Sequence, residues 1–160
     1  MRTSDATLSL LDEQVLRLFR ALRRPGFRSR VLDGVPEIPG VGDLRILRSV
    51  ERHEAQGVSP SIGLVAAELE VEQSTASRAV NAVIARGLLT KTTCVNDQRR
   101  TRLHLTDEGV SALRKATRNR SALLAEITAD WTDEECRTLS ALLARLLEGY
   151  DHIEAAYGAR

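Results

Sequence analysis

Three arginines, Arg99, Arg100 and Arg102, lie within four residues of the stretch NDQRRTRLHLT (96–106). Guanidinium groups at this spacing repel one another unless an anion neutralises them, and their planar fork suits phosphate. Residues 72–105 carry six basic side chains against two acidic ones, a net charge of +4 in a chain whose net charge is only +1. This local excess is typical of nucleic-acid binding, although a solvated charged face has the same composition.

The other residues that could support chemistry do not form a recognisable site. His53, His104 and His152 lack the spacing of metal ligands, so we expect no metal. We place no Ser/His/Asp arrangement, phosphate loop or pair of catalytic carboxylates, and therefore expect neither an enzyme nor a cofactor. Cys94 and Cys136 are isolated and predict two reduced thiols. A redox role is an alternative for Cys136, since thiols in the first turn of a helix can be reactive.

The composition favours a mainly α-helical protein. Aromatic residues make up only 3% of the 160 residues, while Leu, Ala, Val and Arg are abundant. The N-terminal sequence MRTSDATLSLLDEQ is too polar and acidic for a secretion signal, and no apolar run approaches the roughly 20 residues needed to span a bilayer. We therefore expect a cytoplasmic protein without a membrane partner.

Hydrophobic periodicity predicts six helices, over residues 8–22, 43–54, 60–70, 73–86, 107–130 and from 133 onwards. Pro25 and Gly26 interrupt the chain after the first helix, and VPEIPGVGD (35–43) is typical of a connector. Ser59 is the expected N-cap of the third helix, with Pro60 at its first position. The third and fourth helices are short and almost contiguous, which makes them a candidate helix-turn-helix.

A β-hairpin is predicted after the fourth helix. Two runs rich in β-branched residues and leucine flank the turn sequence NDQR, namely LLTKTTCV (88–95) and RTRLHLT (100–106). We expect Val95 to lie opposite Arg100. In that register Leu103 points towards the core, while Arg102 and His104 point outwards.

The last two helices have clear start signals. Thr106 is placed to cap the fifth helix, and Thr132 with Glu135 forms a capping box at the start of the sixth. The sixth helix carries a leucine stripe at helical spacing: Leu139, Leu142, Leu143, Leu146 and Leu147. This is more apolar surface than one small domain covers, so it indicates a partner chain.

A helix, a turn, a polar helix and a basic hairpin together suggest how DNA would be bound. The second helix of such a unit can lie in the major groove, which is about 12 Å wide. Short hydroxyl side chains permit close approach to phosphates and bases, and an arginine there can bind a phosphate or a guanine. The candidate DNA contacts of this helix are Ser74, Thr75, Ser77, Arg78 and, with weaker support, Asn81.

The tip of the hairpin is expected to reach the adjacent minor groove, whose negative potential attracts an inserted arginine. Arg99 is the candidate for this contact. Asp97 is placed to hold the Arg99 guanidinium in one orientation through a charge-assisted hydrogen bond. Arg100 and Arg102 are expected to bind phosphates.

Residues 61–109 resemble the winged helix-turn-helix of the MarR family of bacterial transcription regulators. The matching sequences are VAAEL, STASRAVNAVIARGLL, the DQR of the wing and LHLTDEG at its end. The family's Asp-x-Arg falls on Asp97 and Arg99. One departure is Glu70, in a turn where glycine is common.

The resemblance implies a mainly α fold with a hairpin wing, a winged helix-turn-helix at 43–109, and dimerisation helices at 1–42 and 110–160. It also implies a homodimer that binds a palindromic operator in double-stranded DNA, most often as a repressor released by a small-molecule effector. In the family the effector site lies between the wing domain and the dimer helices, but no motif assigns its residues here. The alternatives are a winged-helix module that binds protein, and a cysteine-based redox-sensing regulator.

Overall fold

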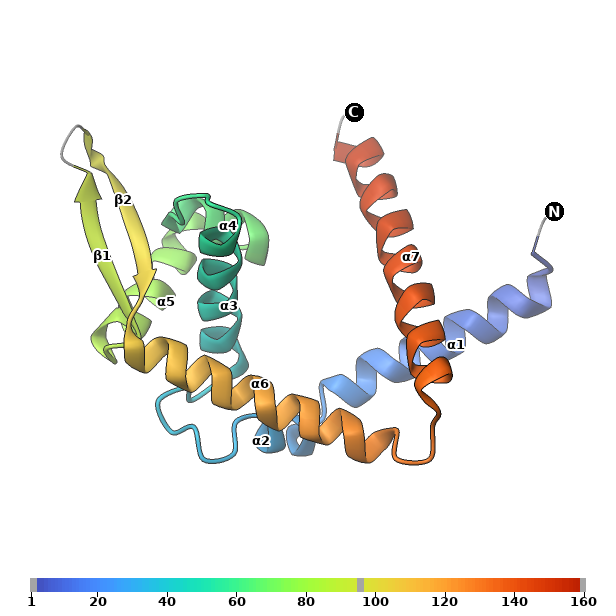
Figure 1. Ribbon diagram of the computed structural model, residues 1–160. Helices are drawn as coiled ribbons and strands as arrows, with labels where there is room; N and C mark the ends of the chain where they lie inside the picture. The colour runs from blue at the N-terminus through green and yellow to red at the C-terminus, as the bar shows by residue number, and fades with distance from the viewer. Residues whose placement is uncertain (1–2, 95–96, 159–160) are drawn as a thin grey trace. The chain divides into compact units, whose positions relative to one another are not determined.

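The computed structural model describes residues 3–94 and 97–158, and the chain divides into two compact units, Met1–Ser121 and Ala122–Arg160. The described elements are, in order, α1 (Asp5–Leu22), α2 (Pro25–Val31), α3 (Val41–Ala55), α4 (Ile62–Leu69), α5 (Gln73–Ala85), β1 (Leu89–Cys94), β2 (Asp97–Leu105), α6 (Asp107–Ile127) and α7 (Asp133–Gly158) (Figure 1). The prediction of a mainly α fold with a hairpin wing is confirmed.

The N-terminal helices differ from the prediction in one respect. Pro25 was expected only to interrupt the chain, but it opens an additional helix, α2. The preceding residue, Arg24, is extended, and the fixed φ of proline suits the first position of a helix. α1 also begins earlier than predicted, because Ser4 caps it by accepting a hydrogen bond from the Thr7 amide at 3.3 Å.

α4 and α5 form the helix-turn-helix. The prediction that Ser59 caps α4 is wrong. The N-cap is Ser61, whose hydroxyl accepts from the Leu64 amide at 3.2 Å. Pro60 instead lies buried before the helix, and its carbonyl accepts from the Leu103 amide at 2.9 Å. Glu70 ends α4 in the left-handed region, with φ of +54°.

The core of the first unit is built where α3, α4 and α5 meet the base of the hairpin (Figure 1). Its fully buried side chains come from all of these elements: Leu47, Val50, Val65, Val80, Val83, Leu88 and Leu103. Apolar residues at helical spacing supply this core, as the periodicity predicts. Packing of this kind fixes α5 against the other two helices.

The hairpin is antiparallel, but the predicted register is wrong by one residue. Thr101 pairs with Thr93, whereas a register with Val95 opposite Arg100 would pair it with Cys94. Val95 itself lies outside the described residues. An irregularity between Thr93 and Cys94 breaks the regular pairing near the tip.

The side chains of β2 alternate between its two faces whichever β1 residues they pair with. Leu103 is fully buried and Arg102 is exposed, as predicted, while His104 is half-buried.

Both predicted caps of the C-terminal helices are present. The Thr106 hydroxyl accepts from the Gly109 amide at 2.9 Å, and Glu135 and Thr132 make reciprocal bonds at 2.7 Å and 3.2 Å. α6 ends at Ile127 rather than near Asp130, because the Trp131 amide bonds to the Thr128 carbonyl and closes a turn. Among the described residues, no helix is long and apolar enough to cross a bilayer.

Candidate nucleic-acid interface

The outer face of α5 presents the predicted contact residues to solvent. Ser74, Thr75, Arg78 and Asn81 are exposed, and Ser77 is half-buried. In the described part of the chain, none of these five side chains makes a hydrogen bond or ion pair. On the opposite face Ala76, Val80 and Val83 are buried. The packing of α5 therefore leaves its polar face free for an external partner.

Two arginines of the α5 region, Arg86 and Arg78, have different environments in the structure, and the sequence does not reveal this difference. Arg86, just after α5, forms an ion pair with Asp43 of α3, with 3.4 Å between Nη1 and Oδ1. Arg78 lies two turns earlier and has no acidic partner in the described residues. Arg86 therefore ties α5 to α3, whereas the Arg78 guanidinium is available to an anion.

The hairpin carries the remaining predicted contacts. Arg102 is exposed on β2 and has no partner among the described side chains. The backbone of Asp97, Arg99 and Arg100 belongs to β2, but their side chains lie outside the described residues. The proposed hydrogen bond between Asp97 and Arg99 therefore stays a prediction.

The base of the hairpin is attached to the helices by both backbone and side-chain bonds. In β2 the Leu103 amide donates to the Pro60 carbonyl at 2.9 Å, and His104 Nδ1 lies 3.0 Å from Glu54 Oε1 at the end of α3. Just after β2, the Thr106 amide donates to the Leu88 carbonyl at 3.2 Å. Beyond these attachments the hairpin extends away from α3, α4 and α5 (Figure 1). The sequence gives no signal for the pairing of Glu54 with His104, because the two residues are fifty positions apart.

A polar network holds α4 against α3. Glu68 of α4 accepts a hydrogen bond from the fully buried Ser49 hydroxyl at 2.6 Å and pairs with the Arg52 guanidinium. His53 Nδ1 donates to the Ser49 carbonyl at 2.8 Å and lies 3.6 Å from Glu68. Because a buried hydroxyl and a half-buried carboxylate satisfy each other here, the angle between the two helices is specified as well as stabilised.

Arg48 joins α3 to α6 through a hydrogen bond from its Nη2 to the Thr117 hydroxyl at 3.1 Å. Burial lowers the pKa of Arg48 from its usual value by disfavouring the charged form, and the nearby charge of Arg120 lowers it further. Its buried Nε has no partner among the described residues.

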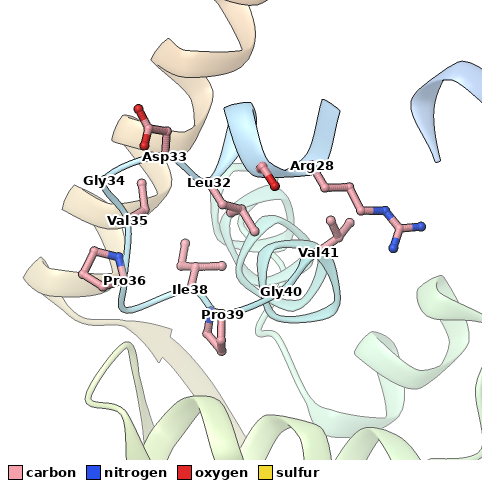
Figure 2. Close-up of a pocket in the computed structure, with 11 residues that line it drawn as sticks. Arg28, Leu32, Asp33, Gly34, Val35, Pro36, Ile38, Pro39, Gly40 and Val41 are labelled. Carbon is pink, nitrogen blue, oxygen red and sulfur yellow. The ribbon is translucent and has the colours of Figure 1, made fainter. Parts of the chain in front are cut away.

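The connector between α2 and α3 surrounds an open recess of about 730 Å³ (Figure 2). Apolar side chains form much of its wall: Leu32, Val35, Pro36, Ile38, Pro39 and Val41. The frame of the recess is fixed by Asn119 of α6, which donates to the Val31 and Asp33 carbonyls at 3.1 Å and 2.8 Å. Such a volume lies within the range of small-molecule pockets.

Two elements leave their apolar side chains uncovered within the chain. α1 has no buried residue, and its stripe at helical spacing comprises Leu8, Leu11, Val15, Leu18, Phe19 and Leu22. In α7 every described side chain is exposed apart from the half-buried Cys136. Its leucine stripe continues into Tyr150, Ile153 and Tyr157, which are 58%, 59% and 74% exposed.

The described residues give no sign of a metal centre, since they contain no group of three or more His, Cys, Asp or Glu that could hold an ion. Cys136 is a free thiol, and the side chain of Cys94 lies outside the described residues. Neither observation adds chemistry to the surface formed by α5 and the hairpin.

Comparisons with known proteins agree with this geometry. Residues 38–100 match the model of the MarR family, whereas no curated protein matches the chain. A MarR family protein from Bacillus stearothermophilus is 17% identical with a TM-score of 0.74, and the match covers 94% of this chain and 99% of that one.

Two further solved structures share the fold. A MarR transcriptional regulator from Methanosarcina mazei is 16% identical with a TM-score of 0.70, covering 91% of this chain and 99% of that one. The YusO protein from Bacillus subtilis is 22% identical with a TM-score of 0.64, covering 92% and 99%.

The matched segment contains α3, α4, α5 and β1, together with the β2 residues up to Arg100, and so includes the helix-turn-helix and the hairpin tip. Members of this family are DNA-binding transcription regulators rather than enzymes. Residues 38–100 therefore carry the sequence pattern of the MarR family, and the chain shares its fold with solved MarR family structures.

Proposed function

We propose that this protein is a sequence-specific regulator that binds an operator in double-stranded DNA through α5 and the hairpin. The observation that carries the proposal is the exposed polar face of α5, where Arg78 and its hydroxyl neighbours have no partner among the described residues. α5 has 13 residues and is therefore about 20 Å long, which suits insertion of its N-terminal half into the major groove.

In this proposal the side chains have distinct tasks. Ser74, Thr75, Ser77 and Arg78 approach bases and phosphates from α5, with Asn81 at the edge of the contact. On the hairpin, Arg99 enters the minor groove and is oriented by Asp97, while Arg100 and Arg102 bind phosphates.

Fluorescence anisotropy titration of an operator duplex over several salt concentrations tests the proposal. Each phosphate that an arginine neutralises contributes about 0.9 to the slope of log affinity against log salt. Arg78→Ala and Arg99→Ala should each weaken binding and flatten this slope by about one unit. Affinity that does not change with salt, or that is unchanged in both variants, would favour a winged-helix module that binds protein.

The active form proposed is a homodimer on a palindromic operator, with residues 43–109 as the DNA-binding domain and 1–42 and 110–160 as dimerisation segments. Support comes from the apolar stripes of α1 and α7, which a single chain leaves in water. A two-fold dimer reads half-sites about 34 Å apart. Sedimentation equilibrium should give twice the monomer mass, and monomers at micromolar concentration would refute this part of the proposal.

The regulator is further proposed to act as a repressor that a small-molecule effector releases from DNA. The recess in the connector supports this idea, because residues of α2 and α3 help to line it, and α3 packs against α4 and α5 (Figure 2). A ligand that fits one dimer geometry better shifts the population towards it.

Filling the recess tests the effector proposal. Val41→Trp places a large side chain in the recess and should leave operator affinity unchanged while abolishing release by an effector found in a ligand screen. Gln56→Trp, at an exposed position after α3, is the matched control and should respond normally. An unaltered response of Val41→Trp would show that the effector binds elsewhere.

A further inference from the structure

The hairpin resembles a lever arm, because its base packs against the helices while its tip extends away from them (Figure 1). β2 runs from Asp97 at the tip to Leu105 at the base, and among the described residues its hydrogen bonds to the rest of the first unit lie at the base. From His104 to Arg99 the strand advances five residues, or about 17 Å. A rotation of about 5° at the base therefore moves Arg99 by about 1.5 Å, which is enough to break a hydrogen bond.

Among the described residues, one hydrogen bond between side chains joins this lever to α3. His104 Nδ1 lies 3.0 Å from Glu54 Oε1, in the last turn of α3. A carboxylate only accepts hydrogen bonds, so Nδ1 is the donor, whether the imidazole is neutral or charged. The two side chains are 44% and 33% exposed, so the bond competes with water and contributes little to folding stability.

The attachments next to His104 hold the inner face of the hairpin base. The Leu103 amide donates to the Pro60 carbonyl at 2.9 Å, and the side chains of Leu89 and Leu103 are buried. The bond from His104 to Glu54 adds an attachment at the adjacent residue, on the other face of the strand, where it resists rotation of the hairpin about its base.

We propose that Glu54 and His104 form a latch that sets the angle of the hairpin and so positions Arg99 for its contact with DNA. Both are positioning residues, because they act through the hairpin and need not touch DNA themselves. This inference rests on the proposed DNA-binding function and on Arg99 as a contact.

Glu54 affects DNA binding in two ways, through its negative charge and through its hydrogen bond to His104, and the two effects have opposite signs. Removing a carboxylate beside a basic hairpin raises the local positive potential and, by charge alone, strengthens DNA binding. Loss of the latch instead weakens binding, because Arg99 is no longer held in place. Whether removal of the Glu54 carboxylate strengthens or weakens DNA binding therefore shows which of the two effects is larger.

The test measures operator affinity by anisotropy for three full-length variants. Glu54→Ala removes the acceptor and should weaken binding about two- to fivefold, the range expected for an exposed pair. Glu54→Gln keeps an oxygen that accepts from Nδ1 and should restore affinity to within about twofold of the wild type. Glu51→Ala is the matched control: it removes a carboxylate from an exposed position one turn earlier on α3 and should not weaken binding.

A double-mutant cycle with Arg99→Ala shows whether the latch acts through the hairpin tip. Glu54→Ala should have no further effect once Arg99 is removed, whereas a general loss of folding would weaken both backgrounds equally. The latch is overturned if Glu54→Ala binds as well as the wild type, or if its effect persists in the Arg99→Ala background. Failure of Arg99→Ala to weaken binding would remove Arg99 as a DNA contact and overturn the latch, whereas the proposed function fails only if Arg78→Ala has no effect either or if affinity does not change with salt.

Discussion

Gly109, in the first turn of α6, has the closest backbone neighbour of the glycines that the structure describes. A Cβ built on Gly109 would lie 2.1 Å from the Leu88 carbonyl oxygen and 3.0 Å from its carbon. Both atoms belong to backbone, so no side-chain rotation relieves the clash. The same carbonyl accepts a hydrogen bond from the Thr106 amide, and Leu88 itself is fully buried. We therefore predict that Gly109→Ala destabilises the fold.

The magnitude follows from three contributions. Overpacking in a closely packed site costs about 1–3 kcal/mol, and loss of the hydrogen bond from Thr106 to Leu88 costs about 1 kcal/mol. Alanine favours a helix over glycine by about 1 kcal/mol, which offsets part of this cost. The expected net destabilisation of Gly109→Ala is about 1–3 kcal/mol, or a fall of about 2–12 °C in the unfolding midpoint.

Gly42→Ala is the matched control, because Gly42 also lies in the first turn of a helix of the same unit. Nothing lies within 4 Å of the position that its Cβ would occupy. Urea unfolding followed by circular dichroism should therefore give opposite signs, with Gly42→Ala neutral or more stable by up to about 1 kcal/mol. If Gly109→Ala proved as stable as the wild type, the close approach of α6 to the hairpin base would be refuted.

Three further outcomes are expected. Glu70→Gly should raise the free energy of unfolding by about 1 kcal/mol in urea titrations, since glycine relieves the strain at φ of +54°. Asn119→Ala leaves two backbone carbonyls of the connector without their donor and should lower that free energy by about 1–2 kcal/mol in the same assay. The backbone amide of Thr132, and then its hydroxyl, lower the pKa of Glu135 by donating hydrogen bonds, so its stabilisation is present above the unfolded pKa and is lost as pH falls through the folded pKa. Thermal melts between pH 5 and 3 should therefore show a smaller acid-induced loss of stability in Glu135→Gln than in the wild type.

Local signals in the sequence predict much of the fold. The Thr132 and Glu135 capping box and the cap at Thr106 are present because short-range hydrogen bonds depend only on neighbouring residues. The alternation of β2 correctly predicts a buried Leu103 and an exposed Arg102. Period alone decides which face a side chain occupies.

The errors arise where a local signal has two meanings. A proline ends one helix or opens another, and at Pro25 it opens α2. A serine before a proline resembles an N-cap, but at Ser59 the burial of Pro60 and the bond from Leu103 to its carbonyl favour a later start at Ile62.

The site was predictable only in part. The exposed face of α5 follows from helical periodicity, and Arg78 has no partner in the part of the chain that the structure describes, which agrees with a role in DNA binding. The pairing of Arg86 with Asp43 and of His104 with Glu54 depends on packing between distant segments, which no spacing along the chain reveals. The first pair shows that Arg86 has a structural role, whereas Arg78 is available to an anion. The second pair shows what holds the base of the hairpin.

The uncovered stripe of α1 has a genetic consequence. In the proposed homodimer, a copy that retains α1 and α7 but carries a defective α5 still associates with normal copies. Since a dimer with one defective α5 no longer recognises a two-fold site, most dimers in a cell that makes both forms are inactive. Mutant alleles that alter α5 should therefore be dominant over the normal allele, whereas alleles that truncate the chain within α1 should be recessive.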